Sequence, residues 1–98
     1  MAKAHVTSEF TVHDARACAE YSRQVPATIE QHGGRFLVRG GHTNQVEGDA
    51  HGNWRVVIEF PDRDTLVSWY YGLEYQAILP IRHAKSVGTI AFVDGVET

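Results

Sequence analysis

The chain has 98 residues, of which 43% are hydrophobic and 21% charged, and its formal net charge is -3. This length supports one modest core, so residues 1–98 are predicted to form a single domain. A weak negative charge without a basic block argues against a nucleic-acid partner. The single cysteine, Cys18, excludes an intramolecular disulfide and a four-cysteine zinc site. No apolar run approaches the roughly 20 residues that span a bilayer, so no membrane partner is expected.

Runs that alternate between apolar and polar residues predict four strands. They cover residues 5–12, 35–39, 54–60 and 89–93. In the second run, alternation places Phe36 and Val38 on a core face and Arg35, Leu37 and Arg39 on the opposite face. The polar connection between the second and third runs is expected to contain a short extra strand near residues 45–47.

The first helix is predicted over residues 15–32, after Asp14 as its N-cap. Pro26 lies inside it and predicts a kink or two consecutive helical pieces, because proline removes one helical hydrogen bond. A glycine pair, Gly33 and Gly34, is expected to end the helix.

The second helix is predicted after Asp62, which is a suitable N-cap, and Gly72 is expected to end or bend it. One or two further helical turns are predicted over residues 74–79, ending before Pro80. The resulting β-α-β-β-α-β order is the ferredoxin-like pattern. We therefore predict an α+β fold with a four-stranded antiparallel sheet and both helices on one face.

The other face of the predicted sheet mixes charges of both signs with few apolar residues. In one interpretation it is solvated, and its cross-strand pairs contribute about 0–1 kcal/mol each. In the other, the sheet of a second subunit covers it and forms a barrel with a polar interior that holds a small molecule. Alternation alone does not choose between them. Its charged candidates for a pocket are Glu9, Arg39, Arg55 and Glu59.

Arg39 and Glu59 are the first candidates for a functional pair. An arginine fork can hold a carboxylate or an enolate in bidentate fashion, and a partly desolvated glutamate can act as a base. The structural alternative is an ion pair between neighbouring strands, which Arg55 could complete. Trp69 and Tyr70 either pack in the helix stripe or reach the pocket with an aromatic edge. Arg82 either closes the pocket mouth or caps helix carbonyls.

Six histidines raise the question of a metal site. His42 and His51 could converge with Glu47 and Asp49 in the long connection, but the histidines lack paired helical or strand spacing. No metal site is predicted. Cys18 is interpreted as a small buried hydrophobe.

Several linked motifs resemble the bacterial family called domain of unknown function 1330. The resemblance covers nearly the whole chain and departs from the family pattern at residues 49–53 and 72–74. It implies membership of the dimeric α/β-barrel superfamily, with a ferredoxin-like fold and a homodimer whose sheets meet face to face. The motifs are Gly33-Gly34-Arg35-Phe36-Leu37-Val38-Arg39-Gly40-Gly41, Glu47-Gly48, Arg55-Val56-Val57-Ile58-Glu59-Phe60-Pro61, Trp69-Tyr70, Glu74-Tyr75-Gln76 and Arg82.

The expected function is the binding of a small anionic or oxygenated metabolite in a polar pocket between the sheet and the helices. Cofactor-independent isomerisation and monooxygenase-like oxygenation are the candidate reactions, and no cofactor is expected. The alternative is a non-catalytic dimeric binding or stress-response module, so the sequence leaves open whether the protein is an enzyme. The expected partners are a second copy of the chain and the small molecule, and the expected location is the cytoplasm.

Overall fold

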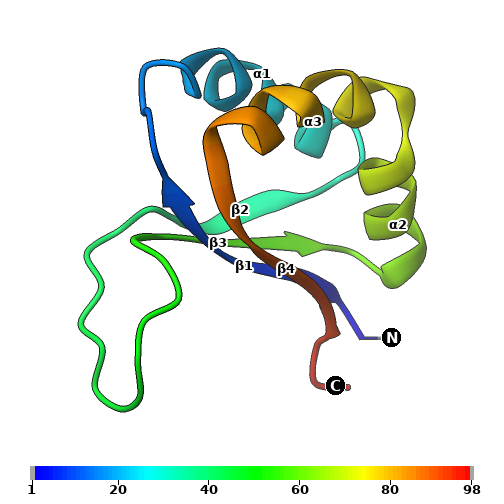
Figure 1. Ribbon diagram of the computed structural model, residues 1–98. Helices are drawn as coiled ribbons and strands as arrows, with labels where there is room; N and C mark the ends of the chain where they lie inside the picture. Colours follow the sequence, from blue (N-terminus) through cyan, green and yellow to red (C-terminus); the bar gives the residue numbers. More distant parts are fainter. Residues whose placement is uncertain (1, 98) are drawn as a thin grey trace.

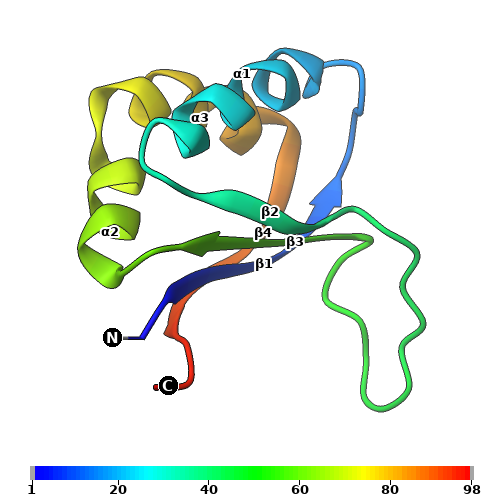
Figure 2. The same cartoon turned by 180° about the vertical axis from the view of Figure 1, so that it is seen from behind.

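The computed structural model describes residues 2–97 and contains one four-stranded sheet in the order β2-β3-β1-β4, with all neighbours antiparallel. Figures 1 and 2 show the helices of the described residues on one face of this sheet and the other face uncovered. This agrees with the predicted α+β order. The elements are β1 (Ala4–Val12), α1 (Ala19–Glu30), β2 (Arg35–Arg39), β3 (Trp54–Phe60), α2 (Arg63–Tyr71), α3 (Leu73–Lys85) and β4 (Ser86–Asp94).

The core fills the space between the sheet and the helices. Trp69 lies at its centre with 1% of its surface exposed, and its ring centroid is 4.3 Å from that of Tyr75 and 5.3 Å from that of Phe60. The indole Nε1 donates a hydrogen bond to Thr28 Oγ1 at 2.9 Å. Burial of its large apolar surface with a satisfied N–H makes this residue a main source of stability.

Strand β2 contains a β-bulge that the alternation of the sequence does not reveal. The extra residue is Leu37, because the pairing with β3 skips it, and side-chain direction reverses after it. The prediction that Val38 faces the core and that Arg39 shares a face with Arg35 was therefore wrong. Arg39 lies on the helix side of the sheet. The pairs are Arg35–Glu59, Phe36–Ile58, Val38–Val57 and Arg39–Val56.

Helix α1 begins later than predicted and continues past its proline as one helix. The Asp14 carboxylate accepts hydrogen bonds from the backbone N–H groups of Arg16 and Ala17, so it caps a separate turn that precedes the helix at Ala19. Pro26 lies inside the single helix, and the two helical pieces considered from the sequence are not present.

Helix α3 extends through Pro80 to Lys85, beyond the predicted end at residue 79. Strand β4 then begins directly at Ser86, whose hydroxyl donates to the Arg82 carbonyl at 2.8 Å. Arg82 thus belongs to the helix and faces inward with 8% of its surface exposed.

The two helix boundaries around α2 agree with the prediction. The side chain of Asp62 accepts from the Thr65 N–H at 2.8 Å, and Gly72 ends the helix. The connection over residues 40–53 holds no strand, so the predicted short strand near residues 45–47 was wrong. In Figures 1 and 2 this connection projects away from the helices, beyond the sheet. No helix in residues 2–97 has the length and apolar character required to cross a membrane.

Candidate functional site

The predicted pocket residues fall on opposite faces of the sheet. One group lines a cavity on the helix side: Arg39, Trp69 and Arg82. Another group lies on the open face, where no helix packs: Glu9, Arg55 and Glu59. Tyr70 lines a separate hollow beside β4, next to Arg82. The structure therefore does not bring Arg39 and Glu59 together, because the bulge in β2 separates them.

The cavity lies between the sheet and helices α1 and α3 and has a volume of about 520 Å³. This volume is in the range of small-molecule sites, which are mostly apolar with a few polar groups. Sequence reasoning had assigned several of its wall residues to the core face of the sheet, under the helices. The apolar and aromatic residues of the wall include Val6, Phe10, Val25, Phe36, Trp54 and Ile58.

Arg82 is the most unusual group in the wall. Its guanidinium carbon lies 4.7 Å from the centroid of the Phe10 ring and 6.0 Å from that of Tyr21. Its Nε atom is buried and has no hydrogen-bond partner. Among residues 2–97 no carboxylate forms an ion pair with it. Because a guanidinium stays charged in proteins, the cavity carries a positive charge that no ion pair within residues 2–97 neutralises.

Two tyrosines extend the polar part of the wall. The hydroxyl oxygens of Tyr21 and Tyr75 are 2.7 Å apart, and Tyr75 is almost fully buried behind Tyr21. Burial and the neighbouring Tyr75 raise the pKa of Tyr21 strongly, although the nearby Arg82 acts in the opposite direction. Tyr21 is therefore held neutral, and its hydroxyl can donate a hydrogen bond beside the Arg82 guanidinium.

The open face carries ion pairs, but in the described residues Glu59 pairs with Arg35 and not with Arg39, the partner that the structural alternative gave it. The Glu59 carboxylate lies 3.1 Å from Arg35 Nε, 3.2 Å from His5 Nε2 and 3.3 Å from Lys3 Nζ. Partial burial raises the pKa of Glu59, but hydrogen bonds from His5, Lys3 and Arg35 outweigh this effect and hold the pKa below its ordinary value of 4.5. Arg55 Nη1 donates to Glu9 Oε1 at 2.5 Å.

Replacing Glu59 with glutamine is expected to weaken the pH dependence of stability in mild acid. Because the pKa of Glu59 is lower in the folded state, its stabilisation is present above 4.5 and is lost as the pH falls through the folded-state value. Urea unfolding between about pH 5 and pH 3 measures the slope. Glu20→Gln, which alters an exposed pair with Arg23, should keep the wild-type slope. An equal slope in Glu59→Gln would contradict the role of this network.

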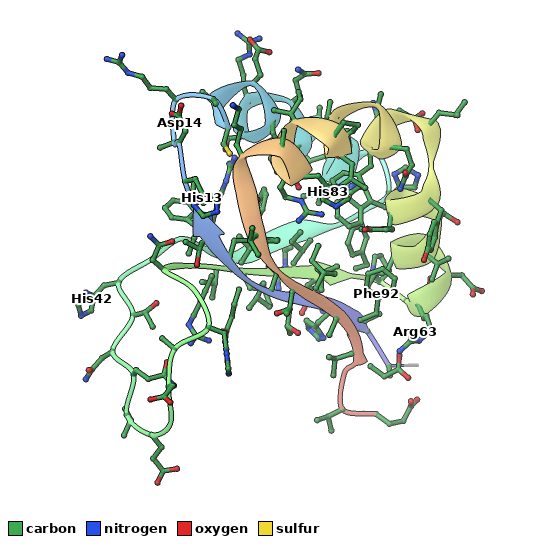
Figure 3. All side chains as sticks on the ribbon, in the orientation of Figure 1. His13, Asp14, His42, Arg63, His83 and Phe92 are labelled. Carbon is green, nitrogen blue, oxygen red and sulfur yellow. The ribbon has the colours of Figure 1, made fainter. Side chains whose placement is uncertain are left out.

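The histidines do not form a metal site in the part of the chain that the structure describes. No group of three or more His, Cys, Asp or Glu side chains converges there. Figure 3 shows His42 on the projecting connection, away from His13 and His83. The convergence of His42 and His51 with Glu47 and Asp49, which was considered from the sequence as the less favoured alternative, is not found among the described residues.

One sequence signal could have identified the cavity. Tyr75, Ile78, Leu79 and Arg82 follow helical spacing, so the apolar stripe of α3 continues across Pro80 and ends in an arginine. A charged residue on an inward stripe marks a candidate site. The contribution of Phe10 and Trp54 could not be recognised, since each has the pattern of an ordinary core aromatic, whereas the hydroxyl of Tyr21 could be named from the sequence as a candidate to reach the cavity.

Topology, sheet order and a cavity between sheet and helices define a ferredoxin-like α+β protein. The chain belongs to the family described as domain of unknown function (DUF1330), which matches residues 3–96. The family resemblance of the sequence motifs is thereby confirmed. Comparison with curated proteins gives no match.

Solved structures share the fold at low sequence identity. A protein of unknown function from Rhodopseudomonas palustris, RPA0582, superposes with a TM-score of 0.80 at 16% identity, covering 99% of this chain and 85% of its own. SnoaB, described as a cofactor-independent oxygenase from Streptomyces nogalater, gives 0.66 at 15% identity, with 100% and 97% covered. A dabb family protein with a ferredoxin-like fold from Mesorhizobium loti gives 0.55 at 17% identity, with 100% and 99% covered. These likenesses establish the fold.

Proposed function

We propose that the cavity between sheet and helices binds a small organic anion with an apolar body, and that Arg82 holds its acidic group. The observation that carries this proposal is the buried Arg82 guanidinium without a carboxylate partner. A buried charge is costly unless it is paired, and a planar guanidinium matches a carboxylate or an enolate oxygen. The aromatic and aliphatic wall fits the remainder of such a ligand.

The reaction class that this arrangement favours is cofactor-independent oxygenation or isomerisation through an enolate or phenolate. Arg82 and the neutral Tyr21 hydroxyl would donate hydrogen bonds to the developing oxyanion. The description of SnoaB as a cofactor-independent oxygenase supports this choice at the level of the fold. Binding without catalysis, in a dimeric binding or stress-response module, is the alternative, and it would use the same Arg82 contact.

Calorimetric titration with two probes of equal shape tests the binding proposal. 2-Naphthoate carries a carboxylate, whereas naphthalene-2-methanol is neutral, so only the first can pair with Arg82. We expect the carboxylate to bind at least about tenfold more tightly, which is the effect of one charge-assisted hydrogen bond. Bound 2-naphthoate should also protect Cys18, a buried wall residue, from methyl methanethiosulfonate. Equal affinities, or no binding of either probe, would overturn the proposal.

The partner that the open face fits best is a second copy of the chain. Glu9 Oε2 and Arg55 Nε are buried on this face without hydrogen-bond partners among the described residues. Polar groups of a second subunit that faces them would supply the missing hydrogen bonds. The face also presents Val38, Val57 and Val93 beside its charged residues. We therefore include a homodimer with facing sheets in the proposal. A location in the cytoplasm belongs to it as well, and a free thiol such as Cys18 is compatible with that compartment.

Replacing Ala91 with glutamate is expected to convert the dimer to a monomer. Ala91 is exposed on the open face and pairs with Thr7 of the neighbouring strand β1. A carboxylate there would be desolvated between two sheets without a partner. Sedimentation velocity at micromolar concentration measures the change. Val67→Glu on the outer side of α2 should leave the dimer intact. An unchanged dimer in Ala91→Glu would assign the contact to another surface.

A further inference from the structure

Six of the seven arginines of this chain fall into two kinds according to their contacts, and the seventh, Arg16, is exposed. Four form ion pairs on the surface: Arg23, Arg35, Arg55 and Arg63. Arg39 and Arg82 instead lie over aromatic rings of the cavity wall, Phe36 and Phe10, at 4.6 Å and 4.7 Å from the ring centroids. Neither has a carboxylate partner among residues 2–97. The cavity wall therefore contains two cations that form no ion pair with the described part of the chain.

The two cations occupy different depths of the cavity. Arg82 is 92% buried, because 8% of its surface is exposed, whereas Arg39 is exposed although it also lines the wall. Arg39 comes from the end of β2 and Arg82 from α3, so they approach the cavity from the sheet and from the helix layer. We assign Arg82 to the closed end and Arg39 to the mouth.

Two irregularities of the backbone hold Arg39 in this position. The bulge at Leu37 turns the Arg39 side chain toward the helices. Pro26 has no N–H, so the carbonyl of Ser22, four residues earlier, lacks its helical donor. Arg39 Nη2 donates to this carbonyl at 2.5 Å. One contact fixes the guanidinium at the mouth, while its other N–H groups stay available for a ligand.

We infer that Arg39 is a second anion-binding residue of the same cavity and that the ligand carries an acidic group at each end. This inference rests on the proposed function, because it extends the ligand held by Arg82. The apolar body would lie between the two guanidinium groups, against the aromatic wall. The ligand class is a small dicarboxylate, or an aromatic acid with a second acidic oxygen, rather than a simple monoacid.

A pair of probes with the same body tests the second anchor. Naphthalene-2,6-dicarboxylate differs from 2-naphthoate only by a second carboxylate at the far end. We expect the wild-type protein to bind the dicarboxylate about tenfold more tightly, and Arg39→Gln to bind both probes equally. The affinity for 2-naphthoate should change less than about twofold in this variant. Calorimetric titration measures all four affinities.

Arg35→Gln is the matched control, because it removes the same charge from the same strand but on the open face. It should keep the tenfold preference of the wild-type protein. Should Arg39→Gln fail to fold, Arg39→Lys, which keeps the charge without the planar fork, is expected to reduce the preference. A preference that persists in the Arg39 variant, or that is absent in the wild type while 2-naphthoate binds, overturns the second anchor alone. Failure of both probes to bind overturns the proposed function itself.

Discussion

Arg82→Met is expected to weaken the binding of 2-naphthoate and to raise the melting temperature of the protein. Binding should weaken by about 10-fold to 100-fold, since hydrogen bonds to a charged group contribute about 1.5–3 kcal/mol. Stability should rise because the buried guanidinium has no carboxylate partner, and replacing such a charge by an apolar side chain removes its desolvation cost. Methionine is unbranched and can occupy the space against Phe10.

One contribution opposes the gain in stability. The contact of Arg82 with the Phe10 and Tyr21 rings is worth up to about 2 kcal/mol, whereas the desolvation of an unpaired charge costs several. Calorimetric titration and thermal unfolding measure the two effects on the same sample. Arg63→Met, which breaks an exposed pair with Asp94, should retain binding and melt near the wild-type temperature. A destabilised Arg82→Met variant that still binds 2-naphthoate would show that Arg82 is a structural residue.

Trp69→Ala is expected to lower the free energy of unfolding by about 3–5 kcal/mol. Such a loss is a large fraction of the roughly 5–15 kcal/mol that stabilises a small domain. The substitution removes a side chain that is 1% exposed, leaves a void against Phe60 and Tyr75, and takes the indole donor from Thr28. Urea unfolding followed by circular dichroism gives the difference between variant and wild type.

Tyr71→Ala provides the control for Trp69, since Tyr71 belongs to the same helix but is 68% exposed. It should cost less than about 1 kcal/mol, the scale of its ring contact with Tyr70. A loss below about 2 kcal/mol for Trp69→Ala would mean that the core collapses into the vacated space, because the cost of such truncations depends on how far the site relaxes.

The order of elements could be predicted from the sequence because each depends on local chemistry. The side chain of Asp62 caps the start of α2, and Gly72 ends the helix. Both roles can be predicted from residue type. The alternation of β3 places Ile58 and Phe60 in the core, as observed. Helix caps, helix ends and strand faces each depend on only a few neighbouring residues, so residue type and periodicity are sufficient to predict them.

The bulge could not be predicted, since Phe36, Leu37 and Val38 are all apolar and their pattern does not show which residue the pairing skips. Register is decided by pairing with β3, which is distant in sequence. The extension of α3 past Pro80 was missed for a related reason. Proline disfavours a helix interior, but the burial of Ile78, Leu79 and Arg82 on either side of it outweighs this local preference. The cavity depends on both the bulge and the extended helix. The residues that line it could therefore be identified only from the structure.

The bulge also has a consequence for how this chain can diverge. Since Leu37 is one extra residue, loss of a single codon there would restore regular pairing and leave Arg39 opposite Val56, on the cavity side of the sheet. The cation would stay in the ligand cavity, and the strand would lose only the exposed side chain of Leu37. A change of one residue in length at this position can therefore alter the twist of the strand without altering the charge of the cavity. Relatives that lack this residue would keep the arginine in the cavity.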